Sequence, residues 1–300
     1  MTLNSSKWIW RVTAWISAIA TVVLVVGFIN AFQDVNGSYT EPSAAEDQIT
    51  GSTEEENPDM NNPDEANESE DNNDISKEPS TVLPPLPDDI KITAIGDSLA
   101  KGTGDNTGEG YVRRSIQQLN ENGRKSELLN NLAINGLTTE GLLTRLEDQG
   151  IRYALEKADL ILLSIGGNDL FQGSGLVENG QAGAGEFSPE QLVQEIPRAS
   201  ERLKEILQNI RQLNPTARVI YIGLYHPFAD FQELLIPGNI AVSTWNHAAQ
   251  QIINEDPNMV LVPTFDLFQG KLGQYLSSDH FHPNGDGYQL IAERIAKGIL

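Results

Sequence analysis

The sequence contains no cysteine, and its 20 Lys and Arg residues are outnumbered by 42 Asp and Glu. The absence of cysteine excludes disulfides and a lipidated N-terminal cysteine, and it suits a protein outside the cytoplasm that avoids stray oxidation. The few basic residues form no cluster. Because phosphate binding relies on Lys and Arg, we expect no nucleic-acid partner.

Residues 33–89 have almost no aromatic side chains and hold 17 Asp or Glu against one Lys. Such a segment cannot bury enough apolar surface to offset the entropy lost on ordering, so we predict a disordered, self-repelling acidic linker. The segment ends in a proline-rich stretch at 82–87, which favours extended backbone. Most of the formal net charge of −22 therefore belongs to this linker rather than to the folded part.

Charged side chains are absent from Val12 to Ile29, an apolar run of 18 residues. As a helix the run would cover roughly 27 Å at about 1.5 Å per residue, close to the thickness of a bilayer core. Lys7 and Arg11 precede it and acids follow, so the positive-inside tendency puts the N-terminus in the cytoplasm. We predict a single-pass membrane anchor over residues 1–32, with a cleaved signal peptide as the alternative. Either interpretation places the rest of the chain outside the cytoplasm, at the cell membrane or secreted.

From residue 90 the sequence alternates between short apolar runs and amphipathic segments. Segments expected to form strands lie at 90–95, 127–133, 159–165, 217–223 and 259–262. The third of them is a nearly continuous apolar run, as expected for a central strand covered on both faces. Helical periodicity and capping residues predict helices at 109–121, 138–146, 189–213, 240–255 and 285–299. The alternation predicts one α/β domain over residues 90–300 with a five-stranded parallel sheet.

The polar groups with catalytic potential each follow one of the predicted strands. Ser98 follows the first, Gly136 the second and Asn168 the third, while Asp279 and His282 lie beyond the fifth. Because ligands bind at the carboxyl ends of the strands of an open parallel sheet, we expect these residues to share one rim. A serine becomes nucleophilic at neutral pH when an imidazole removes its proton and a carboxylate orients that imidazole. The set therefore indicates serine catalysis.

A metal site built from Asp279, His280 and His282 is the alternative use of the C-terminal cluster. Structural and catalytic metal sites need further ligands, and this short cluster has no fourth partner in the sequence. We therefore expect no metal at this position.

Four blocks of the sequence resemble those of the SGNH (GDSL) hydrolase family, in the family's order. They are Gly-Asp-Ser-Leu at 96–99, Gly136, Gly-Asn-Asp at 167–169 and Asp-x-x-His at 279–282. The resemblance covers residues 90–300 and implies a three-layer α/β/α sandwich similar to flavodoxin. It also implies esterase, lipase, thioesterase or carbohydrate deacetylase activity that needs no metal or cofactor.

Carried over position by position, the resemblance makes Ser98 the nucleophile, His282 the base and Asp279 the partner of the base. The oxyanion hole would consist of the backbone N–H groups of Ser98 and Gly136 together with the side-chain amide of Asn168. The Asp-x-x-His spacing of the family selects His282 rather than its neighbour at 280 as the base.

The substrate is expected to be a carboxylic ester with a lipid or small acyl group, and acetylated wall polysaccharide is the alternative. A non-catalytic cell-surface binding module is a further alternative, against which the four intact blocks argue. His226 and Phe228 follow the fourth predicted strand and are candidates to line the substrate pocket, with an ordinary surface loop as the alternative. The glycine-rich segment 173–187 is either a mobile lid or a flexible loop without a role.

Overall fold

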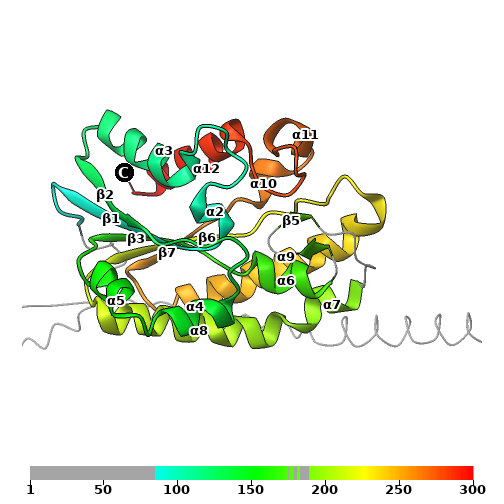
Figure 1. Ribbon diagram of the computed structural model, residues 1–300, viewed down its shortest axis with the longest axis horizontal. Helices are drawn as coiled ribbons and strands as arrows, with labels where there is room; N and C mark the ends of the chain where they lie inside the picture. The colour runs from blue at the N-terminus through cyan, green and yellow to red at the C-terminus, as the bar shows by residue number, and fades with distance from the viewer. Residues whose placement is uncertain (1–84, 175, 179–180, 183–188, 300) are drawn as a thin grey trace, which may run out of the picture. The chain divides into compact units, whose positions relative to one another are not determined.

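The computed structural model describes residues 85–174, 176–178, 181–182 and 189–299 (Figure 1). The predicted anchor and residues 33–84 of the predicted linker lie outside these ranges, so both stay predictions. Within the described ranges, no helix is both long and apolar enough to cross a bilayer.

Five parallel strands form the central sheet, which confirms the predicted number and direction of strands. They are β1 (Ile90–Gly96), β2 (Ser126–Asn131), β3 (Leu160–Ser164), β6 (Arg218–Ile222) and β7 (Met259–Val262). Their order is β2-β1-β3-β6-β7. This is the doubly wound order in which the connections change direction between β1 and β3, and such a switch point opens a crevice at the carboxyl ends of the strands.

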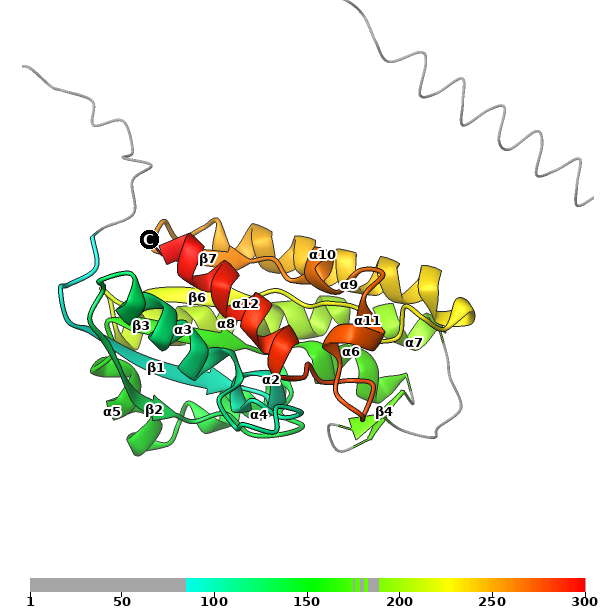
Figure 2. The ribbon, with the colours of Figure 1, turned by 90° about the horizontal axis from the view of Figure 1, so that it is seen from above.

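Helices cover both faces of the sheet and give the predicted three layers (Figures 1 and 2). One layer holds α3 (Gly110–Glu121), α10 (Phe265–Phe268), α11 (Leu272–Tyr275) and α12 (Gly285–Ile299). The other holds α4 (Thr139–Arg145), α5 (Gln149–Glu156), α8 (Ile196–Leu213) and α9 (Gln232–Ile253). Side chains alternate along β3, so that Leu160 and Leu162 join the core under α3 and α12 while Ile161 and Leu163 join the other core.

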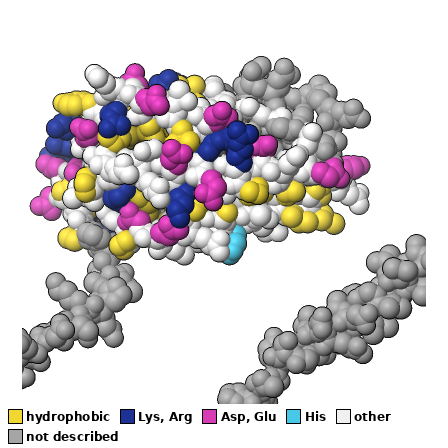
Figure 3. Space-filling model, turned by 90° about the horizontal axis from the view of Figure 1, so that it is seen from below, with side chains coloured by type: hydrophobic (Ala, Val, Ile, Leu, Met, Phe, Trp, Pro, Cys, Tyr) yellow, Lys and Arg dark blue, Asp and Glu magenta, His cyan; other side chains and the backbone are white. Residues whose placement is uncertain are grey.

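The face opposite α3 and α12 carries basic and acidic side chains that are intermixed (Figure 3). Lys204 of α8 lies 2.8 Å from Glu255, and Arg211 of the same helix lies 2.6 Å from Asp256. Both cations are therefore paired with acids.

The predicted helix at 189–213 is wrong as a single element, because the structure divides it into α7 (Pro189–Gln194) and α8. Pro197 is the second residue of α8 and has no backbone N–H to continue a helix from the preceding turn. Proline is tolerated in the first turn of a helix, where that N–H would have no partner, so α8 begins there.

The predicted helix at 240–255 begins earlier than expected, since α9 starts at Gln232 and contains Pro237. The helix continues through both Pro237 and Gly238. A Cβ at Gly238 would lie 2.2 Å from the ring of His226, so the glycine lets that ring pack against the helix.

About half of the glycine-rich segment 173–187 falls outside the described residues. Its described part includes β4 (Val177–Glu178) and β5 (Gln181–Ala182), which pair in antiparallel fashion. The prediction of a lid therefore stays a prediction.

Candidate active site

Ser98 is the first residue of α2 (Ser98–Lys101) and directly follows the turn that ends β1. Asp97 caps this helix, because its carboxylate accepts a 3.1 Å hydrogen bond from the N–H of Leu99. The turn requires glycine at position 96, where φ is 129° and a Cβ would lie 1.9 Å from the carbonyl oxygen of Ser164. The sequence thus builds a tight strand-to-helix turn that fixes the position of the Ser98 hydroxyl.

His282 meets Ser98 although 184 positions separate them in the sequence. Its Nε2 atom lies 2.8 Å from Ser98 Oγ, and the ring is buried. His280, in contrast, is exposed and has a left-handed backbone with φ of 56°. The structure therefore brings together the hydroxyl and the imidazole that the Asp-x-x-His spacing singled out.

Asp279 orients the His282 ring through a 2.7 Å contact between its Oδ2 atom and Nδ1. Its Oδ1 atom accepts hydrogen bonds from the Ser277 hydroxyl at 2.7 Å and from the N–H groups of Phe281 at 3.0 Å and His282 at 2.9 Å. Burial opposes ionisation, but these donors outweigh it and lower the pKa of the Asp279 carboxyl. An ionised Asp279 accepts a hydrogen bond from Nδ1–H of a neutral ring, which leaves Nε2 unprotonated and able to accept the Ser98 proton.

Gly136 and Asn168 lie at the ends of the neighbouring strands. Gly136 occupies the turn after β2 with φ of 74°, and Asn168 is the second residue of α6 (Gly167–Gly173) after β3. In the part of the chain that the structure describes, the N–H groups of Ser98 and Gly136 donate to no acceptor. Unpaired donors beside a nucleophile are suited to bind a developing oxyanion.

The Asn168 amide is held by two hydrogen bonds. Its Nδ2 atom donates to the carbonyl oxygen of Leu137 at 3.0 Å, and its Oδ1 atom accepts from Gln172 Nε2 at 3.1 Å. One hydrogen of Nδ2 is therefore still available to a substrate. Gln172 also donates to the Gly136 carbonyl at 3.2 Å, a role that the sequence analysis missed because it depends on a contact between distant turns.

A cavity of about 40 Å³ lies beside Ser98 and His282. Its other wall residues are mostly apolar: Asp97, Leu99, Gly167, Asn168, Phe171, Leu224, Tyr225, Pro227 and Phe281. The carboxylate of Asp97, the amide of Asn168 and the hydroxyl of Tyr225 are the polar side-chain groups among them, and the Tyr225 hydroxyl donates to the carbonyl oxygen of Phe281. The cavity thus presents hydrocarbon next to a hydroxyl–imidazole pair.

The prediction that His226 and Phe228 line this pocket is not met by the structure. Nε2 of His226 lies 3.0 Å from the carbonyl oxygen of Leu234, and the residue faces a separate hollow beside α9. Burial lowers the pKa of His226, although the hydrogen bond to Leu234 partly offsets the effect. Phe228 packs against Phe171 behind the cavity wall. Pro227, which lies between them in the sequence, lines the cavity instead.

The loop 102–110 packs against the back of His282. A Cβ at Gly104, where φ is 93°, would lie 2.9 Å from Cβ of His282 and 2.6 Å from the carbonyl oxygen of Pro283. Tyr288 of α12 donates a 2.7 Å hydrogen bond from its hydroxyl to the carbonyl oxygen of Thr103. The sequence analysis did not identify this loop as part of the site.

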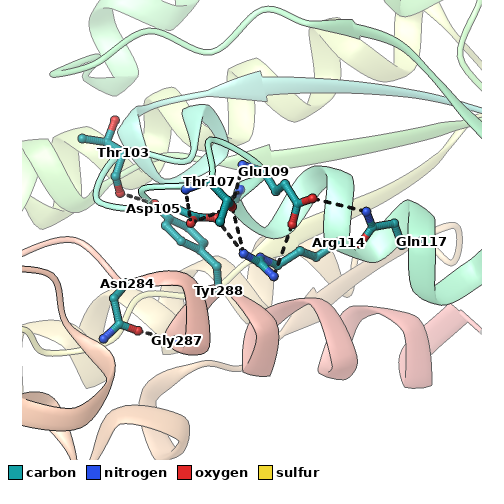
Figure 4. Close-up of polar contacts among 10 residues, drawn as sticks. Thr103, Asp105, Thr107, Glu109, Arg114, Gln117, Asn284, Gly287 and Tyr288 are labelled. Carbon is teal, nitrogen blue, oxygen red and sulfur yellow. Dashed lines mark hydrogen bonds and ion pairs between the residues drawn. The ribbon is translucent and has the colours of Figure 1, made fainter.

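Asp105 organises that loop from within (Figure 4). Its carboxylate accepts from the N–H and the hydroxyl of Thr107, from the N–H of Gly110 and from the guanidinium of Arg114 at 3.1 Å. Burial opposes ionisation, yet these four hydrogen bonds together lower the pKa of Asp105. A buried carboxylate with four donors holds its loop in one conformation.

A model of the GDSL-like lipase/acylhydrolase family matches residues 94–290. An uncharacterized protein of Bacillus subtilis, YpmR, is 33% identical over 213 residues, which cover 70% of this chain and 81% of that protein. The spore germination lipase LipC of Bacillus licheniformis is 26% identical over 211 residues, which cover 69% of this chain and 94% of the lipase.

A solved structure agrees with these sequence matches. The lipase Lip_vut3 from a goat rumen metagenome superimposes with a TM-score of 0.60 at 26% identity, over 69% of this chain and 96% of that one. The similarity thus covers the part of this chain that contains the sheet and the residues around Ser98.

Proposed function

The chain belongs to the GDSL-like lipase/acylhydrolase family and is an ester hydrolase, and we propose that it cleaves carboxylic esters through a covalent acyl-enzyme on Ser98. The proposal is supported chiefly by one observation. Ser98 Oγ, the His282 ring and the Asp279 carboxylate form a continuous chain of hydrogen bonds, with lengths of 2.8 and 2.7 Å.

In the acylation step, His282 Nε2 takes the proton of Ser98 while Oγ attacks the ester carbonyl carbon. The C–O bond to the alcohol then breaks, and the alcohol oxygen leaves with the proton from Nε2. Water attacks the acyl-enzyme in the second step, with His282 again accepting a proton, and the carboxylic acid is released from Oγ. Asp279 stays ionised throughout and stabilises the protonated ring.

We assign the stabilisation of the negative charge that develops on the carbonyl oxygen to three hydrogen-bond donors. They are the N–H groups of Ser98 and Gly136 and the remaining hydrogen of Asn168 Nδ2. Loss of one such donor typically removes about 3 kcal/mol of transition-state stabilisation. The N-terminal end of α2 adds partial positive charge near the same point.

Replacement of the nucleophile tests the proposal. Ser98→Ala is expected to reduce hydrolysis of short p-nitrophenyl esters by at least about 1,000-fold without changing thermal unfolding. Ser200→Ala, on α8, serves as the matched control and should retain full activity. A fluorophosphonate probe should label the wild type and not the Ser98 variant. Turnover near the wild-type rate in the Ser98 variant would refute the assignment.

We also propose that the apolar run 12–29 anchors the hydrolase at the outer side of a cell membrane. The support is the sequence itself, in which two bases precede an uncharged run of bilayer length and an acidic linker follows. Full-length protein should stay in bacterial membranes after alkaline carbonate washing, and added protease should release the hydrolase domain from intact protoplasts. Recovery of a shortened, freely soluble protein would instead indicate a cleaved signal peptide.

A further inference from the structure

We propose that the cavity beside Ser98 is an acyl pocket of fixed depth, which makes the enzyme selective for short acyl groups. The inference rests on the proposed function, because it takes Ser98 as the acylated residue. It concerns the acyl side of the ester and the residues that set its maximum length.

The volume of the cavity limits what it can hold. It measures about 40 Å³, and each water-sized group needs roughly 10–15 Å³ of such volume. The cavity therefore accepts about three groups of that size beyond the carbonyl carbon. This corresponds to acetyl, propionyl and butyryl groups, and a longer chain would have to displace the wall.

The far wall resists displacement because its aromatic rings support one another. Phe171 packs edge-on against Phe281, with ring centroids 6.1 Å apart, and against Phe228 at 5.5 Å. Phe228 and Phe281 stack at 5.8 Å. All three rings are at most 8% exposed. A close-packed cluster of this kind does not yield to one extra methylene without strain.

The opposite wall is fixed through its backbone. The N–H of Leu224 donates to Asn246 Oδ1 at 2.8 Å, and its carbonyl oxygen accepts from Asn246 Nδ2 at 2.8 Å. The hydroxyl of Tyr225 donates to the carbonyl oxygen of Phe281 at 2.6 Å, which joins the two walls. Because these bonds do not involve the Leu224 side chain, shortening that side chain would deepen the cavity while the backbone stays in place.

The acyl group suits this cavity better than the alcohol does. The acyl group remains bound to Ser98 through both steps, whereas the alcohol must leave and water must take its place. A small cavity with mostly apolar walls favours the group that stays and offers water few hydrogen-bond partners. The alcohol then extends away from the aromatic wall.

Chain-length profiles of the full-length enzyme test the proposal. With p-nitrophenyl esters from acetate to decanoate, we expect kcat/KM to be highest between acetate and butyrate and at least about 10-fold lower for octanoate, since one methylene changes such ratios by about 10–200-fold. Leu224→Ala should raise the octanoate-to-acetate ratio by at least about 10-fold. Leu119→Ala removes another buried leucine, from α3, and should leave the ratio unchanged.

A second series keeps the acetyl group and varies the length of the alcohol. The wild type and Leu224→Ala should show the same alcohol preference. A wild-type optimum at octanoate or longer, or a change of alcohol preference in the variant, would overturn the acyl-pocket assignment. If Leu224→Ala does not fold, the octanoate-to-acetate ratio is measured for Phe171→Leu instead. That ratio and the wild-type chain-length profile then decide whether the cavity binds the acyl group. An enzyme that hydrolyses no ester and takes up no fluorophosphonate would instead refute the proposed function.

Discussion

The side-chain amide of Gln172 donates a 3.2 Å hydrogen bond to the carbonyl oxygen of Gly136. The same nitrogen donates to Asn168 Oδ1 at 3.1 Å, so one side chain on α6 joins two of the three proposed oxyanion donors. Gln172 does not itself face the reacting atoms. It acts as a positioning residue that fixes the distance between the turn after β2 and the start of α6.

We expect Gln172→Ala to lower kcat by roughly 10–100-fold and to change KM little. The reason is that oxyanion donors stabilise the transition state more than the bound ester, and a loosened donor loses part of the 100–1,000-fold effect of its complete removal. Steady-state kinetics on a short ester measure the two constants separately. Gln208→Ala on the surface of α8 is the control. A raised KM with unchanged kcat would assign Gln172 to ground-state binding instead.

Asp97 is buried next to the nucleophile. Its ionisation lowers the stability of the fold, whereas the ionisation of a salt-bridged acid usually raises it. Burial raises its pKa from 3.8 to about 6, although hydrogen bonds from the Ser164 hydroxyl and the Leu99 N–H partly offset the effect. The folded-state pKa lies above the unfolded one, so the folded protein loses stability as pH rises between these values. The full shift corresponds to roughly 3 kcal/mol at about 1.36 kcal/mol per pKa unit.

Asp97→Asn should therefore stabilise the protein at pH 7.5 by on the order of 1–3 kcal/mol and give little benefit at pH 4. The amide oxygen can still cap α2 by accepting from Leu99. Chemical denaturation at both pH values measures the effect. Equal stability changes at the two pH values would show that Asp97 is not the titrating group.

Asp279→Asn should lower kcat by about 10,000-fold, because an amide at this position favours the wrong tautomer of His282. The pKa of Asp279 is lowered in the folded state, so its contribution to stability is complete above the unfolded pKa and is lost as pH falls through the folded pKa. Protonation of Asp279 should therefore cause no loss of activity at pH values near neutrality. His280→Ala is the control, and an activity loss in it equal to that of His282→Ala would contradict the assignment of the base.

The central strands β1, β3 and β6 could be predicted because they are buried on both faces and therefore read as apolar runs. The edge strand β2 is only partly buried and includes Glu127 and Asn130, so its signal was weaker. The site residues could be predicted because parallel strands end at one edge, so that Ser98, Asn168 and His282 were expected on one rim. Two further features left local signals that were not used. Pro197 indicated the break before α8, and Asp148 caps α5 by accepting from the N–H groups of Gly150 and Ile151.

Other features of the site had no local signal. Gln172 is 36 positions from Gly136, and nothing near either residue indicates that they meet. The inward or outward direction of Phe228 depends on how its loop packs on α6 and on Phe281. Such contacts follow from tertiary packing, and neither residue type nor spacing in the sequence specifies them.

The ion pair between Arg114 and Asp105 should control both stability and the position of His282. The Asp105 side chain is 1% exposed and that of Arg114 is 15% exposed, so Arg114→Met leaves a buried carboxylate without its only cationic partner at hydrogen-bonding distance among the described residues (Figure 4). Three hydrogen bonds from Thr107 and Gly110 remain, and we therefore expect a loss of about 1–3 kcal/mol rather than the larger cost of an isolated charge. Asp105→Ala removes all four bonds and should be the more damaging change.

The kinetic effect follows from the close packing of the loop on the catalytic histidine. A looser loop lets His282 move away from Ser98, so Arg114→Met should lower kcat by about 10-fold. We expect KM to stay within about 2-fold, since no residue of the loop lines the cavity beside Ser98. Lys125→Met is the matched control, because it breaks an exposed 2.9 Å ion pair with Asp89 far from the site. Stability and kcat of that control should equal those of the wild type. A destabilised Arg114 variant with wild-type kcat would show that the loop supports the fold without positioning His282.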